Sequence, residues 1–392
     1  MNNATKRTSP VVGILKESLC IGGTERSAAN ISRLLENHYE LHFLLFNGSD
    51  IKYSYGGNLV DIDAPPKNSL VGKFINSFIR YFKVKRVIRQ KRIDILYEFI
   101  NIKNMLSFIS YKNTKRIISA RDFGKVQRYT ENFHKALSKA DAMICNSEYI
   151  KDYYISKYPE HEDKVFTVYN AIDGNEISNL TAEQTEKKYN DFVENHSKII
   201  LVAGRFCKEK GFEYMLEAFA KATESMNLGL VMIGDGTYKE KYLKLIKELG
   251  IEDKVYFTGF QDNPYKYMVK SDIFVLSSLS EGFPNVLAEA MSIGLPVISS
   301  NCCSGPAEIL RNDCDYEAVT DNFMECDYGI LTPKMTEEDN QKAISSLADA
   351  MVHLASNENL LKKYSELSKH RALEYSPEVV AKKIEIIIKK LI

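Results

Sequence analysis

SEGFPNVLAEAMSIGLPVISS, residues 280–300, follows a short apolar segment at residues 273–277 that predicts a buried strand. Pro284 suits the first position of a helix, and an apolar, β-branched segment returns at residues 297–299. A loop that joins a strand to a helix in a parallel sheet lies at the carboxyl edge of that sheet, where open α/β folds bind ligands. The stretch therefore predicts an α/β fold with a ligand site in this loop.

Two carboxylates and the start of the predicted helix indicate which ligand this loop would take. Glu281 precedes the helix, and Glu289 lies inside it on the face that also carries Asn285. Backbone N–H groups at the start of a helix suit an anion such as a phosphate, and carboxylates beside it suit the hydroxyl groups of a sugar. The alternative from spacing alone is that Glu281 offsets the helix dipole and Glu289 is a solvated surface charge.

The segment GRFCKEKGFEYMLEAF, residues 204–219, also begins at the end of a predicted strand, residues 199–203. Arg205 and Lys210 flank its tight loop. Two cations fixed at the end of a strand neutralise a diphosphate leaving group without a metal ion. In isolation, two ordinary surface cations are the better interpretation, because the chain has 52 Lys and Arg residues.

Two further glycine turns follow predicted strands. Gly22 and Gly23 precede an amphipathic helix predicted at residues 25–37, and the sequence IGDG occupies residues 233–236. Glycine lets the backbone approach a ligand closely. Neither turn matches a dinucleotide-binding fingerprint, and no phosphate-binding Walker A loop is present. Taken alone, each turn favours a plain connection.

Short apolar segments alternate with amphipathic helices along the whole chain, which predicts parallel sheets covered on both faces. The predicted strands lie at residues 11–15, 41–46, 94–100, 116–119, 142–146, 199–203, 228–233, 255–258, 273–277 and 297–299. Residues 178–197 are polar without clear apolar periodicity and predict a linker. The apolar stretch 378–392 predicts a final helix that packs back across the first domain.

Length and composition agree with two α/β domains. The 392 residues suit two domains, and 44% hydrophobic with 27% charged residues is typical of globular proteins. A net charge of zero argues against a nucleic-acid binder. The charges are unevenly distributed along the chain. Residues 51–150 carry 19 basic and 8 acidic side chains, whereas residues 151–392 carry 28 basic and 39 acidic side chains.

The cysteines and the N-terminus indicate a reducing, cytosolic environment. The seven cysteines are irregularly spaced, and no Cys/His cluster has zinc spacing. We therefore expect reduced thiols. The five apolar residues 11–15 are too short for a signal-peptide core, and no apolar run approaches the length that spans a bilayer.

Residues 71–92 form the most basic stretch of the chain, with eight Lys and Arg and no acid. Five apolar residues recur at helical spacing, and a basic helix with aromatic side chains on one face suits an anionic membrane surface. The alternative is that the apolar face belongs to the domain core. Nucleic acid is the less favoured partner, because RNA-binding modules are missing. The apolar residues are Phe74, Ile75, Phe78, Ile79 and Phe82, and the predicted membrane-contact cations are Lys73, Arg80, Lys83, Lys85, Arg86 and Arg89.

In their joint order, these pieces resemble the retaining glycosyltransferases of GT-B fold. That large family, the family 4-like group, includes sucrose synthase, glycogen synthase and bacterial cell-surface polysaccharide glycosyltransferases. The resemblance covers nearly the whole chain and is densest at residues 198–300. The matching pieces are the Gly22–Gly23 loop, ICNSEYIK (144–151), VYNAID (168–173), GRFCKEKGFE (204–213), IGDGTYKEKY (233–242), VYFTGF (255–260) and SEGFPNVLAEAMSIGLPVISS (280–300), with the spacing of Glu281 and Glu289.

The resemblance implies a GT-B architecture of two Rossmann-like domains facing each other across a cleft. Residues 1–185 would be the acceptor domain, residues 186–375 the nucleotide-sugar domain, and residues 376–392 a helix that packs back on the first domain. The basic stretch would then lie in the acceptor domain.

The resemblance also implies roles for individual residues. Arg205 and Lys210 would hold the donor diphosphate, Glu281 would contact the donor sugar near its reacting carbon, and these three would be catalytic. Glu289 would hold the ribose. The other implied donor-binding residues are Gly22, Gly23, Gly259, Phe260, Asp262, Gly282, Phe283, Pro284, Asn285 and Val286.

One segment departs from the family pattern. Many members carry a histidine in a loop of the first domain near the donor sugar, where this chain has ISARDFG, residues 118–124. Arg121 and Asp122 occupy that loop and are candidates for binding the acceptor or the donor. None of the seven histidines lies at a matching position, and His134 is interpreted as a structural residue of a helix.

The resemblance implies a metal-independent, retaining transferase of hexosyl or N-acetylhexosaminyl groups. Its donor would be a UDP-sugar and its acceptor a lipid-linked or oligosaccharide chain of surface polysaccharide or capsule assembly. No cofactor, metal ion or nucleic acid is expected. The enzyme would be cytoplasmic and associated peripherally with the inner face of the membrane. The alternatives are a sugar-nucleotide epimerase of the same fold and a non-catalytic scaffold that binds a sugar nucleotide.

Overall fold

A computed structural model describes residues 9–20, 22–67, 69–313, 321–336 and 340–392. The chain divides into two compact units, each built around its own sheet. Unit 1 comprises Met1–Ala171 with Pro377–Ile392, and unit 2 comprises Ile172–Ser376. Six cysteines are free, and Cys314 lies outside the described residues. No helix in the described part of the chain is long and apolar enough to cross a bilayer.

Unit 1 has a seven-stranded parallel sheet in the order β3-β2-β1-β4-β5-β6-β7. Strand β1 is buried along its whole length, as expected for a strand covered on both faces. The strands are β1 (Val11–Lys16), β2 (Glu40–Leu45), β3 (Asn58–Asp61), β4 (Ile95–Glu98), β5 (Lys115–Ala120), β6 (Ala142–Cys145) and β7 (Val165–Thr167). The helices are α1 (Gly23–Leu35), α2 (Leu70–Lys91), α3 (Phe123–Arg128), α4 (Thr130–Leu137), α5 (Glu148–Lys157) and α15 (Pro377–Leu391), with short 3-10 helices η1 (Met105–Phe108) and η2 (Pro159–Lys164).

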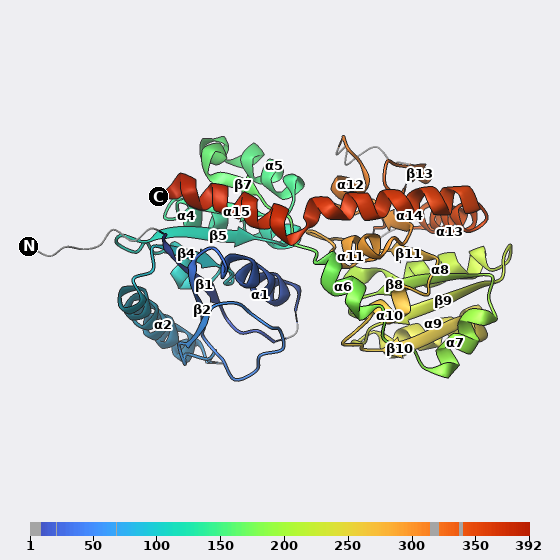
Figure 1. Ribbon diagram of the computed structural model, residues 1–392, viewed down its shortest axis with the longest axis horizontal. Coiled ribbons are helices and arrows are strands. Elements are labelled where there is room, and N and C mark those ends of the chain that lie inside the picture. Colours follow the sequence, from blue (N-terminus) through green and yellow to red (C-terminus); the bar gives the residue numbers. More distant parts are fainter. Residues whose placement is uncertain (1–8, 21, 68, 314–320, 337–339) are drawn as a thin grey trace, which may run out of the picture. The chain divides into compact units, whose positions relative to one another are not determined.

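Helix α15 returns from the end of the chain to unit 1 and lies beside α1 (Figure 1). Its apolar face, which includes Val380 and Ile384, is buried in the same core as Ile31 and Leu35 of α1. The last helix therefore completes one face of the unit 1 sheet.

Unit 2 repeats this plan with the order β10-β9-β8-β11-β12-β14-β13, in which only the β13–β14 pair is antiparallel among the described strands. The strands are β8 (Lys198–Ala203), β9 (Leu228–Ile233), β10 (Val255–Gly259), β11 (Ile273–Leu276), β12 (Val297–Ser300), β13 (Met324–Glu325) and β14 (Ile330–Thr332). The helices are α6 (Gly174–Leu180), α7 (Lys187–Glu194), α8 (Phe212–Ala222), α9 (Lys239–Leu249), α10 (Tyr265–Met268), α11 (Asn285–Ile293), α12 (Gly305–Leu310), α13 (Gln341–Ala355) and α14 (Glu358–Ala372), with 3-10 helices η3 (Lys208–Lys210), η4 (Glu252–Lys254) and η5 (Leu373–Tyr375). Both units are Rossmann-like, which confirms the predicted fold class.

The strand order reverses between β1 and β4 in unit 1 and between β8 and β11 in unit 2. Open parallel sheets bind ligands beyond the carboxyl ends of the strands at such a reversal. In unit 2, the two loops at this point are residues 204–211 after β8 and residues 277–284 after β11. The topology thus brings the segments that carry Arg205, Lys210 and Glu281 to one edge.

The predicted linker at residues 178–197 is wrong, because this region contains α7 and the end of α6. Tyr189 of α7 is fully buried, packs edge-on against Tyr267 and donates its hydroxyl to the Tyr267 backbone carbonyl at 3.0 Å. Helix α6 packs against α10 and α11. The change of unit therefore falls at Ala171–Ile172 rather than between residues 185 and 186.

Candidate active site

The loop that carries Lys210 is fastened to the end of β11 in unit 2. Gly211 follows Lys210 with a φ of +60°, a left-handed conformation that favours glycine. A Cβ at this position would also clash with the carbonyl oxygen of Ser277. The Ser277 hydroxyl donates to the Lys210 carbonyl at 2.9 Å. Glycine therefore lets the β8 loop pass directly against the β11 loop.

Lys210 and Glu281 form an ion pair between these two loops. The Lys210 ammonium lies 2.7 Å from Glu281 Oε1, and the Ser278 hydroxyl donates to the same oxygen at 2.7 Å. The two charged side chains are 23% and 13% exposed, so the pair is shielded yet reachable from solvent. Burial lowers the pKa of Lys210, but the Glu281 carboxylate outweighs burial and raises it, so the ammonium stays charged at neutral pH.

Arg205 lies at the start of the same loop and is exposed. Within the described part of the chain, no hydrogen bond or ion pair holds its guanidinium. The backbone N–H of Glu209 and the Cys207 thiol lower the pKa of Glu209, and both Arg205 and Lys210 lower it further. Arg205 and Lys210 thus both lie close enough to Glu209 to influence its charge, as expected for two cations that neutralise one diphosphate.

The backbone of the β11 loop is clamped before α11 begins. The carbonyl of Gly282 accepts the Ser304 hydroxyl at 2.7 Å and the Gly305 N–H at 3.0 Å. Phe283 is buried with its ring edge-on to Tyr375 at 5.1 Å. Its side chain therefore serves the core, and the backbone of this segment remains the part available to a ligand.

Helix α11 places its residues where the sequence predicted a phosphate-binding helix start. Pro284 precedes the helix as its N-cap residue, one position earlier than expected, and Asn285 and Val286 form its first turn. The N–H groups of a first helical turn have no partner inside the helix. Glu289 is only 4% exposed, so the alternative of a solvated surface charge is wrong for this residue.

The remaining donor-binding candidates of unit 2 lie at the end of β10. Gly259 has a φ of +72°, and its carbonyl accepts the Gly234 N–H at 2.9 Å. This bond joins the β10 end to the IGDG turn. Phe260 is 55% exposed, an unusual exposure for a phenylalanine, and Asp262 is exposed beside it.

Sequence reasoning missed the hydroxyls and the thiol that support the Lys210–Glu281 pair. Ser278 contacts Glu281, and the Ser300 hydroxyl donates to the Ser278 carbonyl at 2.7 Å. Cys302 is buried nearby, and burial followed by the Glu281 charge raises the pKa of its thiol. The sequence does show a Ser-Ser pair at the end of both β11 and β12, and this repetition could have indicated hydroxyls beside the site.

In unit 1, the glycine loop after β1 is built around a second Lys–Glu pair. A Cβ at Gly22 would clash with the Glu25 carboxylate, whereas a Cβ at Gly23 would meet nothing within 4 Å. Glu25 lies 3.0 Å from the ammonium of Lys16, whose side chain is 7% exposed. The Glu25 carboxylate therefore occupies the space beside Gly22, whereas the space beside Gly23 is open.

Arg121 and Asp122 are held by neighbours in unit 1. The Arg121 guanidinium donates to Ser119 at 2.7 Å, to Asn170 at 2.5 Å and to Tyr97 at 2.9 Å, which occupies three of its five N–H groups. The Asp122 carboxylate accepts the N–H of Lys125 at 2.9 Å and caps α3. Their local roles are structural, and two Arg121 N–H groups have no hydrogen-bond partner within the described part of the chain.

The outer face of α2 carries both exposed apolar side chains and exposed cations. Between residues 71 and 82 it exposes Val71, Phe74 and Phe82 at 63–70%, together with Ile75, Phe78 and Ile79 at 42–53%. We call these six residues the apolar face of α2. The alternative that they belong to the core is wrong, because the opposite side of the helix packs on the unit. Lys73, Lys85, Arg86 and Arg89 are exposed.

Two of the predicted membrane-contact cations instead fasten α2 to unit 1. Arg80 donates to the carbonyl of Ala64 at 2.9 Å and lies 4.3 Å from the ring of Phe46. Lys83 donates to the carbonyl of Ile62 at 3.0 Å. These contacts hold the inner face of the helix.

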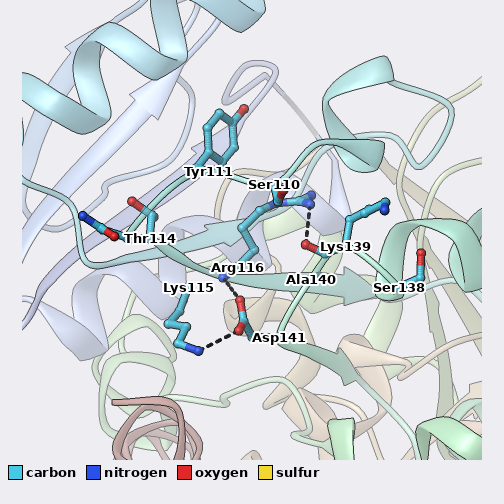
Figure 2. A pocket seen from close by; sticks show the side chains of 10 residues that line it. Ser110, Tyr111, Thr114, Lys115, Arg116, Ser138, Lys139, Ala140 and Asp141 are labelled. Carbon is cyan, nitrogen blue, oxygen red and sulfur yellow. Dashed lines mark hydrogen bonds and ion pairs between the residues drawn. The ribbon is translucent and has the colours of Figure 1, made fainter.

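A hollow of about 540 Å³ lies at the amino end of β5 in unit 1 (Figure 2). Asp141 bridges its floor by accepting the Lys115 ammonium at 2.9 Å and the Arg116 backbone N–H at 3.0 Å (Figure 2). Ligands of parallel sheets bind at the other edge, the carboxyl ends of the strands. The Lys210–Glu281 edge of unit 2, and not this hollow, is therefore the candidate site.

Comparison with known proteins agrees with this geometry. The family model described as glycosyl transferases group 1 matches residues 183–322, and the model described as Glycosyltransferase Family 4 matches residues 21–176. An uncharacterised glycosyltransferase of Methanocaldococcus jannaschii is 28% identical over 95% of this chain and 98% of its own length. The Campylobacter jejuni N-acetylgalactosamine-N,N'-diacetylbacillosaminyl-diphospho-undecaprenol 4-alpha-N-acetylgalactosaminyltransferase is 28% identical over 95% of this chain and 97% of its own length.

Solved structures share the fold of the whole chain. A glycosyltransferase from Rickettsia africae has a TM-score of 0.76 at 16% identity and covers 98% of this chain and 99% of its own. Anabaena HepE in complex with UDP-glucose has a TM-score of 0.72 at 18% identity and covers 97% of this chain and 100% of its own. The chain therefore belongs to the GT-B glycosyltransferases of the family 4-like group.

Proposed function

We propose that this glycosyltransferase is a retaining, metal-independent enzyme that uses a UDP-sugar. The observation that carries the proposal is the Lys210–Glu281 pair, which lies with Arg205 on two adjoining loops at the strand-order reversal of unit 2. Lys210 and Arg205 offset the charge of the leaving diphosphate, and the first turn of α11 supplies N–H groups. Glu289 binds the ribose hydroxyls, and the Gly259–Asp262 segment lines the base.

The chemistry requires positioning more than a protein base. The bond between the anomeric carbon and the diphosphate oxygen breaks, and the acceptor hydroxyl oxygen bonds to that carbon on the same face. The proton of the acceptor hydroxyl passes to the departing phosphate oxygen. Glu281 orients the donor sugar, while the cations stabilise the charge that develops on the diphosphate.

Removing either member of the Lys210–Glu281 pair tests the catalytic assignment. We expect Lys210→Met and Glu281→Gln each to lower kcat/KM by about 100-fold or more, the usual loss for one charge-stabilising group. The assay is a panel of nucleotide-sugars scored for released nucleotide diphosphate. Product linkage by NMR tests retention, and activity in EDTA tests metal independence.

A second Lys–Glu pair of unit 2 provides the matched control. Lys241 lies 2.6 Å from Glu213 and joins α9 to α8. Lys241→Met and Glu213→Gln should keep full turnover. Wild-type turnover in the Lys210 and Glu281 variants would refute the assignment. Conversion of the sugar nucleotide without an acceptor product would indicate an epimerase. Binding of the sugar nucleotide without any turnover would indicate a scaffold.

We further propose that unit 1 receives a lipid-linked acceptor at an anionic membrane surface. The Campylobacter relative is named for a diphospho-undecaprenol-linked substrate. The apolar face of α2 supports the proposal, because six exposed large apolar side chains on one helix form a patch that a protein surface rarely leaves uncovered. The exposed cations Lys85, Arg86 and Arg89 continue the same helix and would meet lipid phosphates.

Substituting the aromatic residues of this face tests the membrane proposal. We expect the triple variant Phe74→Ser, Phe78→Ser, Phe82→Ser to lose flotation with vesicles of phosphatidylcholine and phosphatidylglycerol while its melting midpoint stays close to wild type. The control is Ile386→Ser, because Ile386 is 59% exposed on α15 of the same unit. Equal flotation of wild type and triple variant would exclude α2 as the contact.

A further inference from the structure

Two histidines and a glutamate from two elements of unit 1 lie close together. His134 lies on α4, while Glu160 and His161 lie on η2. His161 Nε2 is 3.2 Å from His134 Nδ1, and His134 Nδ1 is 3.8 Å from Glu160 Oε1. The three potential ligand atoms all lie within 4.8 Å of one another. From the sequence, His134 is interpreted as a structural residue of a helix, and its partners Glu160 and His161 are more than twenty residues away in the chain.

We propose that His134, Glu160 and His161 bind a divalent transition-metal ion, with Zn²⁺ as the best match. Zinc bonds to histidine nitrogen at about 2.0–2.1 Å, so two nitrogens on one tetrahedral ion lie roughly 3.3 Å apart. The two ring nitrogens already stand at that separation. Imidazole and carboxylate ligands suit zinc, nickel and copper, whereas magnesium and calcium prefer oxygen ligands alone.

The aromatic surroundings hold both imidazole rings in place. The ring of Tyr158 stacks on His134 with centroids 4.1 Å apart, and Tyr158 donates its hydroxyl to Glu131 at 2.9 Å. The ring of Tyr154 stacks against His161 at 6.3 Å. Rings that are fixed before binding lose little entropy when the ion arrives. When both nitrogens ligate the ion, each ring carries its proton on its other nitrogen.

The site is closed on one side and open on the other. His161 is 8% exposed, whereas the side chains of His134 and Glu160 are 30% and 57% exposed. A hydrated ion can therefore enter from the Glu160 side, and water completes the coordination as it does at open zinc sites. Glu160 closes the remaining distance by a side-chain movement. The bound ion would fasten α4 to η2.

Zinc titration of the full chain tests the proposal. Metal-free protein with its accessible thiols alkylated is titrated with ZnCl₂ in competition with a chromophoric chelator. We expect one zinc per wild-type chain. His134→Gln should weaken binding by about 100-fold, since even outer-shell substitutions cost about 10–100-fold, and the more exposed Glu160→Gln by about tenfold. Zinc should also raise the melting midpoint of wild type but not of His134→Gln.

Two control variants separate the site from general zinc affinity. Glu162→Gln removes an exposed acid of the same 3-10 helix, and His353→Gln removes a histidine that pairs with Glu325 at 2.8 Å. Both controls should bind zinc as wild type does. Absence of saturable binding in wild type, or unchanged binding in His134→Gln, would show that the two histidines share only a hydrogen bond. Glycosyl transfer should persist in Glu160→Gln. The result of the zinc titration is therefore independent of the catalytic assignment.

Discussion

Each unit has a Lys–Glu pair at the carboxyl end of the first strand of its sheet or in the loop after it. In unit 2, Lys210 pairs with Glu281 across two loops, whereas in unit 1, Lys16 at the end of β1 pairs with Glu25 of α1. The unit 1 pair occupies the space that a side chain at Gly22 would need. Glu25 therefore lies against Gly22 in the glycine loop, and its charge is suited to a pH test.

The Glu25 carboxylate should make unit 1 sensitive to acid. Burial raises the pKa of Glu25, but the Lys16 ammonium together with hydrogen bonds from the Glu25 backbone N–H and Thr24 outweighs burial and lowers the pKa below the ordinary value of 4.5. A lowered pKa contributes stability that is present above pH 4.5 and is lost as the pH falls through the folded-state pKa. We expect Glu25→Gln to reduce the free energy of unfolding by about 1–3 kcal/mol at pH 7.

Urea unfolding between pH 3 and pH 7 measures this difference. The gap between wild type and Glu25→Gln should narrow as the pH falls below 4.5. Glu378→Gln is the control, because Glu378 is an exposed acid in the first turn of α15. A gap that stays constant with pH would mean that Glu25 acts through shape and not through charge.

The residue types of the candidate site are readable from sequence, but their contacts are not. Lys210 and Glu281 are 71 positions apart, and their 2.7 Å contact depends on two loops that meet only after the sheet has formed. The burial of Glu289 had a readable signal, since its neighbours in α11 are apolar on several sides and Leu287, Ala288, Ala290 and Met291 are buried too. A helix that is apolar all round is a buried helix.

At the scale of elements, strands were easier to predict than short polar helices. The β8 and β9 segments are continuous apolar runs, and the structure buries nearly all of both. Helix α7 was predicted as linker because most of its residues are polar. Its apolar positions are Tyr189, Phe192 and Val193, and the rings of Tyr189 and Phe192 pack on Tyr256. Three apolar positions in eight residues are too few for periodicity to distinguish a helix from a linker.

Helix α15 should contribute to the stability of unit 1 through one face only. Ile384 is fully buried in the core that contains α1, whereas Ile386 on the same helix is 59% exposed. We expect Ile384→Ala to lower the free energy of unfolding by about 2–4 kcal/mol, through lost burial and the cavity left behind. Ile386→Ala should change it by less than about 0.5 kcal/mol. Similar midpoints for the two variants in urea unfolding would contradict the packing of α15 on unit 1.

At the scale of the whole molecule, the neutral total charge divides between the two units. Unit 1 carries 31 Lys and Arg against 19 Asp and Glu, and unit 2 carries 21 against 33. Unit 1 therefore has a strongly positive net charge, and unit 2 has a negative net charge of the same size. An anionic membrane would attract one unit and repel the other, which gives a neutral chain a preferred orientation.

This division predicts a membrane interaction that depends on salt and on only one unit. Each cation near an anionic surface is worth about 1 kcal/mol, so the triple variant Lys85→Gln, Arg86→Gln, Arg89→Gln should bind anionic vesicles about 100-fold more weakly. Raising the salt from about 0.05 M to about 0.5 M should release wild type as well, because screening shortens the reach of these charges several-fold. The matched control neutralises three exposed cations of unit 2, Lys244, Lys362 and Lys363. Because unit 2 is acidic, losing these charges should leave vesicle binding unchanged or weaken it only slightly. Flotation that falls equally in both triple variants would show that net charge, and not the α2 surface, attracts the chain to lipid.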